Sequence, residues 1–164
     1  MSPYTIQPNK TDLYEFVTDS FVAYEVAFKP TPYLFDEGSA FSTFIVELVI
    51  RIGANSTNQY PPLDKRVATT IAAIVDDYYQ TRPETIALYV CDSSDGRQAA
   101  RKRKFEDWFR YFNQAEFIKH DLPVTDQKDG VVYYNSIILK ANNPFLSEII
   151  SEFDTLFGRY NDPK

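Results

Sequence analysis

Residues 85–113 read TIALYVCDSSDGRQAARKRKFEDWFRYFN, and no other stretch says as much about the fold. The apolar run at 86–91 has the length and composition of a buried strand, and the polar residues at 92–96 predict a turn. Residues 97–113 follow with helical spacing of their apolar side chains, with cations in the first half and aromatic rings in the second. The stretch therefore predicts a strand, a turn and an amphipathic helix.

The first 52 residues predict three strands. Residues 13–17 and 21–28 indicate a hairpin, because apolar side chains alternate with smaller or polar ones along its second arm. Residues 29–39 contain prolines and a glycine and predict a loop. Residues 41–52 are apolar at both odd and even positions, which is typical of a strand covered on both faces.

Two further helices are expected from their end signals. Asp64 follows a polar connection at 53–63 and can cap a helix that continues to about Gln80. Asn143, followed by a proline, predicts the start of a last helix that ends at Gly158. Apolar residues recur at helical spacing in both helices and are expected to be buried. They are Val67, Ile71, Ile74, Val75 and Tyr78 in the first, and Leu146, Ile149, Ile150, Phe153, Leu156 and Phe157 in the second.

Strands are also expected at 116–120 and 131–140, with a turn at 126–130 between them. The elements then follow the order β-β-β-α-β-α-β-β-α. This order favours an α+β fold in which helices pack on a single, mostly antiparallel sheet. No internal repeat or linker interrupts the chain, and we expect residues 1–164 to form one domain.

The composition restricts the class of protein. The chain has 164 residues, 44% of them hydrophobic and 24% charged, which is ordinary for a globular protein. Its single cysteine excludes an internal disulfide and the zinc motifs that need several cysteines. Residues 1–11 do not resemble a signal peptide, and the apolar runs are too short to span a membrane. We expect a cytoplasmic protein that has no membrane contact, no metal site and no bound cofactor.

The turn before the basic helix is the main candidate site, and it comprises Asp92, Asp95, Gly96, Arg97 and Arg101. Cations are disfavoured at the start of a helix, where the helix dipole is already positive, and this placement needs compensation. Free backbone N–H groups with the two arginines could hold a phosphate or a carboxylate. In the alternative, Asp92 or Asp95 pairs with Arg97 or Arg101 and the turn is a structural ion pair.

The basic residues at 97–104 make nucleic-acid binding a further hypothesis. Proteins that bind single strands stack the bases on exposed rings beside a positive groove. Here the net charge is −6, and the rings at 105, 108, 109 and 112 recur at the spacing of a buried face. We therefore expect Lys102, Arg103 and Lys104 on a solvated face, and we do not favour nucleic acid as a partner.

Few residues suit a catalytic site. His120 is the only histidine, and any Ser-His-Asp or Cys-His arrangement would need it, but its charged neighbours favour a solvated surface position. Cys91 ends an apolar strand, where nucleophiles are sometimes placed, yet cysteine is among the most buried residue types. Asp76 and Asp77 point about 100° apart on a helix and do not converge on a metal. No catalytic residue is assigned, and enzymatic activity stays an open question.

Two resemblances add to this interpretation. Residues 64–78, beginning Asp64-Lys65-Arg66, and residues 88–109 around the Asp95-Gly96-Arg97 turn resemble a small bacterial domain family of unknown function. That resemblance implies that this turn and Arg101 are shared by the family. The order of elements is also similar to the later part of the GNAT-type acetyltransferase fold. That second resemblance implies a coenzyme whose pyrophosphate lies on the loop that opens at Gly53.

Three functions remain under consideration. The favoured one is a non-enzymatic bacterial interaction module, which binds a protein partner or a second copy of itself through an aromatic or basic surface. The first alternative is an acyltransferase-like protein, complete or degenerate, that binds a phosphate-bearing cofactor at the Gly53 loop or at residues 95–101. The second is a nucleic-acid-associated protein that uses residues 97–104. Exposed tyrosine and phenylalanine side chains would support the first.

Overall fold

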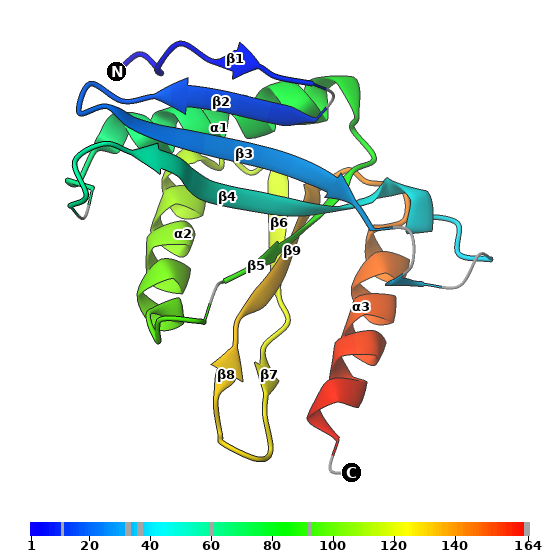
Figure 1. The fold of residues 1–164 in the computed structure, drawn as a ribbon. Coiled ribbons are helices and arrows are strands. Elements are labelled where there is room, and N and C mark those ends of the chain that lie inside the picture. The colour runs from blue at the N-terminus through cyan, green and yellow to red at the C-terminus, as the bar shows by residue number, and fades with distance from the viewer. Residues whose placement is uncertain (11, 32–33, 36–37, 60, 92, 163–164) are drawn as a thin grey trace. The chain divides into compact units, whose positions relative to one another are not determined.

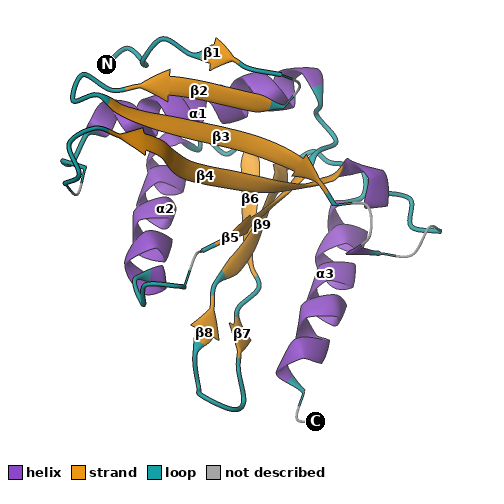
Figure 2. Ribbon diagram, viewed as in Figure 1, coloured by secondary structure: helices purple, strands orange, loops and turns teal. Residues whose placement is uncertain are grey.

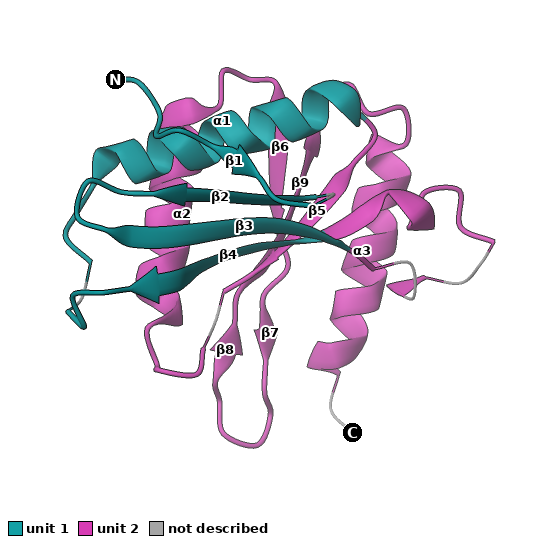
Figure 3. Ribbon diagram, turned by 45° about the horizontal axis from the view of Figure 1, so that its top comes forward, with its two compact units in different colours: residues 1–29, 47–83 teal, residues 30–46, 84–164 magenta. Residues whose placement is uncertain are grey.

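The computed structural model describes the whole chain except residues 11, 32–33, 36–37, 60, 92 and 163–164. The chain forms two compact units, each built from two segments (Figure 3). Unit 1 contains Met1–Lys29 and Glu47–Pro83, and unit 2 contains Pro30–Val46 and Glu84–Lys164. That the units fold together as one domain stays a prediction.

Unit 1 contains strands β1 (Gln7–Pro8), β2 (Leu13–Val17), β3 (Val22–Pro30) and most of β4 (Ile45–Asn55), adjacent in that order. The predicted hairpin is confirmed, because β2 and β3 pair antiparallel, with Phe16 opposite Tyr24. Its turn is held by the Thr18 hydroxyl, which accepts a hydrogen bond of 3.1 Å from the backbone N–H of Val22. Strand β1, which adds two residues to this sheet by pairing with β2, was not predicted.

Helix α1 (Lys65–Thr81) begins where the sequence predicts (Figure 2). The Asp64 carboxylate accepts a hydrogen bond of 2.9 Å from the backbone N–H of Arg66, and the Tyr4 hydroxyl donates to the same carboxylate at 2.6 Å. The helix packs on the sheet of unit 1, where the Tyr78 ring stacks on Phe28 with 3.8 Å between centroids. The predicted apolar stripe is buried except for the half-buried Val75.

The predicted strand at 41–52 is wrong at its start and in its burial. A 3₁₀ turn occupies Ser42–Phe44, and β4 begins at Ile45 and continues to Asn55. Phe41, just before this turn, is buried in the core, and an apolar side chain that a turn buries looks in the sequence like part of a strand. Only the first part of β4 is deeply buried, whereas Ile52 is 44% exposed.

Unit 2 contains a three-stranded antiparallel sheet with β9 (Asn135–Lys140) between β5 (Ile86–Val90) and β6 (Phe117–Asp121). Helices α2 (Gln98–Phe112) and α3 (Leu146–Asn161) cover its opposite faces (Figure 1). Ile86 and Leu88 belong to the core that Phe153 and its neighbours on α3 complete. Tyr89, which points to the other face of β5, stacks on Phe105 of α2 with 4.1 Å between centroids.

The predicted strand at 131–140 is in fact two strands. Val132–Tyr133 form β8, which pairs with β7 (Val124–Thr125) in a separate hairpin closed by the predicted turn at 126–130. The chain leaves the strand conformation at Tyr134, whose carbonyl accepts a hydrogen bond of 3.0 Å from the backbone N–H of Cys91. Strand β9 starts at the next residue.

The limits of the last helix also differ from the prediction. Asn143 accepts a hydrogen bond of 2.9 Å from the backbone N–H of Phe145, and this bond organises a turn before α3 begins at Leu146. Gly158 lies inside the helix, which continues to Asn161. The predicted α+β class, the mostly antiparallel pairing and the order of the long elements are confirmed, with β1 and β7 as additions and the predicted strand at 131–140 divided into β8 and β9.

Candidate functional site

The turn between β5 and α2 is organised by its own polar groups. Gly96 has a φ of 72°, a left-handed conformation that glycine adopts at low cost, and its N–H donates to the carbonyl of Ser93 at 3.1 Å. One Asp95 oxygen accepts a hydrogen bond of 3.0 Å from the backbone N–H of Arg97. The helix then starts at Gln98, so Arg97 is its flanking residue and not part of its first turn.

Asp95 compensates the cation at the start of α2. Both of its oxygens accept hydrogen bonds from the Arg101 guanidinium, each at 2.7 Å, in the bidentate geometry that arginine favours with carboxylates. The Arg101 contact, with the Arg97 backbone N–H as the second cause, lowers the pKa of Asp95 to about 2. Asp92 lies outside the described residues. The structure therefore contains the ion pair between Asp95 and Arg101, and binding of an external anion at this turn stays a prediction.

The aromatic half of α2 is less buried than its spacing predicts. Phe105 is the single buried residue of the helix, whereas Trp108, Phe109 and Phe112 are half-buried and Tyr111 is 81% exposed. Helical spacing places rings on one side of a helix but does not say what covers that side. The expectation of a buried aromatic face is therefore wrong for the last turn and a half of α2.

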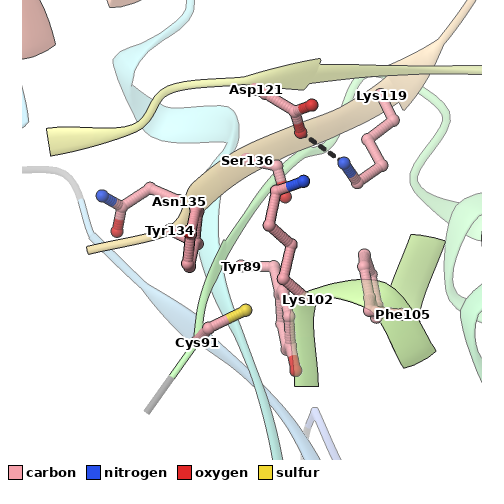
Figure 4. A pocket seen from close by; sticks show the side chains of 9 residues that line it. All are labelled: Tyr89, Cys91, Lys102, Phe105, Lys119, Asp121, Tyr134, Asn135 and Ser136. Carbon is pink, nitrogen blue, oxygen red and sulfur yellow. Dashed lines mark hydrogen bonds and ion pairs between the residues drawn. The ribbon is translucent and has the colours of Figure 1, made fainter. Parts of the chain in front are cut away.

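A small pocket that opens to solvent lies between α2 and the sheet of unit 2 (Figure 4). The Cys91 sulfur and the Lys102 side chain both point into it. The remaining lining residues come from β5, α2, β6, and β9 with the residue before it: Tyr89, Phe105, Lys119, Asp121, Tyr134, Asn135 and Ser136. The pocket thus contains two lysines, Lys102 and Lys119, and one thiol, which are residue types that can act as nucleophiles or bases in an active site.

The two lysines of the pocket are engaged by carboxylates. The Lys119 side chain is only 10% exposed, and its ammonium group pairs with Asp121 and lies 3.8 Å from Glu106. Lys102 pairs with the same Glu106 one helical turn away. The expectation of a solvated Lys102 is wrong, because its stem crosses the pocket and its side chain is 30% exposed. Arg103 and Lys104 do lie on the exposed face.

The thiol of the pocket is a weak nucleophile at neutral pH. Cys91 is 4% exposed, as predicted, and burial raises the pKa of its thiol. Burial also raises the pKa of the neighbouring Tyr89 hydroxyl. Because the thiolate is the reactive form of cysteine, burial disfavours a nucleophilic role for Cys91.

His120 has a structural partner. Its Nε2 lies 2.7 Å from a carboxylate oxygen of Asp154, an ion pair or hydrogen bond that links β6 to α3. The side chain is 29% exposed, which places it at the surface but not fully in solvent. No group of three or more metal-ligating side chains is found among the described residues.

The Gly53 position does not form the start of a phosphate-binding loop. Gly53 lies within β4, and a Cβ atom there would be 2.9 Å from a carboxylate oxygen of Glu25. Glu25 also pairs with Arg51. Glycine at this position makes room for a carboxylate, which would repel a pyrophosphate. The true connection, from 56 to 64, begins three residues later than predicted.

A family model for a family of unknown function, DUF6169, matches residues 63–155, more than half of the chain. The chain belongs to this family. The DUF6169 segment contains α1, the turn at 93–97, the whole of α2 and the pocket, so the candidate site lies inside the part that defines the family. It is an uncharacterised family, as the first resemblance implied.

The other comparisons add no function. No curated protein and no solved structure matches the chain. The resemblance to GNAT-type acetyltransferases therefore finds no support in them. Within the described residues, no helix has the length and apolar character needed to cross a membrane.

Proposed function

We propose that this DUF6169 protein is a non-enzymatic interaction module whose binding surface is the exposed face of α2. The observation that carries the proposal is the aromatic end of that helix. Four rings occupy the five positions from Trp108 to Phe112, and none of them is buried. Aromatic side chains with partial exposure are enriched at protein interfaces, where they supply large contact area at a low entropic cost.

The reactive groups of unit 2 support the non-enzymatic part of the proposal. Cys91 is buried and its thiol pKa is raised, and His120 pairs with Asp154. Arg101 pairs with Asp95 and Lys119 with Asp121. A nucleophile or general base has to reach its substrate, whereas the Cys91 thiol is buried and the other three side chains are engaged by carboxylates.

The distribution of charged residues indicates the charge of the partner surface. Residues 97–112 contain six cations and two carboxylates, whereas the rest of the chain contains eleven cations and 21 carboxylates. Arg103, Lys104 and Arg110 are exposed on this helix, and Arg97 is exposed at the position just before it. A basic and aromatic surface on an acidic protein is suited to an acidic protein surface, which it would attract over a distance of about 10 Å at 0.1 M salt.

Photo-crosslinking in cells tests the proposal. A photoreactive phenylalanine analogue would replace Tyr111, which is 81% exposed on α2. A second probe would carry the analogue at Tyr160 in α3, which is 59% exposed, and the matched control would carry it at Phe21 in unit 1, which is 74% exposed. We expect a discrete crosslinked protein at position 111 that is absent at position 21.

Three outcomes would argue against the proposal. The first is an equal, diffuse set of products at all three positions, because it would show that α2 has no special affinity. The second is a crosslink at position 111 to nucleic acid, which would favour the basic residues at 97–104 as a nucleic-acid surface. Activity in a coupled assay with acetyl coenzyme A would contradict the non-enzymatic part.

A further inference from the structure

We infer that the acidic surface bound by α2 is helix α3 of a second copy of the same chain. This inference rests on the proposed function, because it identifies the partner of the same surface. The two helices have nearly equal lengths, 15 and 16 residues, or about 22–24 Å at the rise of an α-helix. Each presents one long exposed face, and the charges of these faces are opposite.

The exposed face of α3 is acidic. Glu148 and Glu152 lie one turn apart on it, against one exposed cation, Arg159, in the last turn, and Tyr160 is 59% exposed. Among the described residues, neither glutamate has an ion-pair partner. Within the described part of the chain, Arg103 and Lys104 have no carboxylate partner, and the Lys104 ammonium group lies 4.9 Å from the centre of the Trp108 ring. Two cations and two carboxylates are therefore available for each other.

The topology of unit 2 requires that this contact form between molecules. Helices α2 and α3 cover opposite faces of the sheet that contains β5, β9 and β6, so one copy cannot bring its own two helices together. The α2 helix of one copy would meet the α3 helix of the next. Such a head-to-tail contact adds further copies with concentration unless the arrangement closes into a ring.

Two other contacts between copies are less favourable. Packing α2 against α2 would bring two basic faces together, and like charges across an interface are strongly disfavoured. The carboxylates on the sheet of unit 1 are partly used, because Glu15 accepts a hydrogen bond of 2.8 Å from Asn9 and Glu25 pairs with Arg51. The glutamates of α3 are the better match.

A charge-exchange experiment tests the inference. One variant carries Arg103→Glu and Lys104→Glu, and a second carries Glu148→Lys and Glu152→Lys. All four side chains are exposed, so both variants are expected to fold, which thermal unfolding would verify. Mass would be measured by light scattering over a range of concentrations, at about 0.01 M salt and at about 1 M salt, where the Debye length falls from ~30 Å to ~3 Å.

We expect the wild-type mass to rise above the 19.0 kDa of one chain with concentration at low salt and to return to it at high salt. Each variant alone should stay monomeric, because its two helices carry the same charge. A mixture of both variants should associate again, since each basic helix then finds an acidic one. A control with Asp76→Lys and Glu84→Lys has the same net charge as the second variant and should associate like wild type.

The inference is overturned if the wild type stays at 19.0 kDa at every concentration, or if the mixed variants do not associate. Association that the control variant also loses would overturn it as well, since net charge and not the α3 face would then be responsible. A monomeric wild type whose position 111 still crosslinks to a different acidic protein would preserve the proposed function and refute the second copy as partner.

Discussion

Helices α1 and α2 are similar in length, 17 and 15 residues, but they are stabilised in different ways. Helix α1 buries seven residues and has a side-chain cap, whereas α2 buries one and has no side-chain cap. Burial of apolar surface is the main favourable term in folding, so α1 is part of the structural core of unit 1. Helix α2 is held by one buried ring, by half-buried side chains and by ion pairs, which leaves its outer face available for binding.

The largest effect should come from a cavity in α1. Ile74 is fully buried, and Ile74→Ala should destabilise the protein by about 2–5 kcal/mol in denaturant unfolding. The matched change in α2 is Trp108→Ala, and we expect its cost to be about 1 kcal/mol because the ring is half-exposed. Equal losses from the two variants would show that α2 is covered in solution and would remove the difference between the helices.

The cap of α1 should have the next largest effect. Asp64→Ala removes the acceptor for the Arg66 N–H and leaves the Tyr4 hydroxyl, which is hydrogen-bonded to it at 2.6 Å, without that partner. We expect a loss of about 1–2 kcal/mol, at the upper end of measured helix caps. Asp76→Ala is the control, since Asp76 lies exposed on the same helix and bonds only Gln80 in the described contacts. A control that costs as much as Asp64→Ala would contradict a specific role for the cap.

The features that could be predicted from the sequence are local ones. Asp64 precedes an apolar stripe at helical spacing, and together they define the start of α1 without any knowledge of the tertiary structure. The proximity of Asp95 and Arg101 could be anticipated in the same way, because a tight turn and one helical turn bring residues this close in sequence together. The pairing of these two groups was one of the two alternatives that the residues left open.

The features that could not be predicted depend on distant residues. The strand break at Tyr134 lies beside the end of β5, where the Tyr134 carbonyl accepts a hydrogen bond from the backbone N–H of Cys91, 43 positions away in the sequence. Phe105 is buried because the Tyr89 ring of β5 stacks on it, whereas Tyr111 is 81% exposed. Which part of α2 is covered therefore depends on the position of β5. A helical stripe specifies a face, whereas the partner that covers the face is a property of the whole fold.

The smallest effect should come from the ion pair that opens α2. The folded-state pKa of Asp95, about 2, lies below the value of about 3.9 for an unpaired aspartate. A carboxylate whose pKa is lowered by folding contributes stability that is present above about pH 4 and is lost as the pH falls toward 2. Asp95→Asn should therefore flatten the dependence of unfolding free energy on pH in this window and leave the slope near neutrality unchanged. Asp107→Asn, which removes an exposed carboxylate 3.8 Å from Arg110 on the same helix, is the control for the loss of one surface charge. A wild-type slope in Asp95→Asn would mean that Arg101 finds compensation elsewhere, and the start of α2 would then regain its candidacy as a site for an external anion.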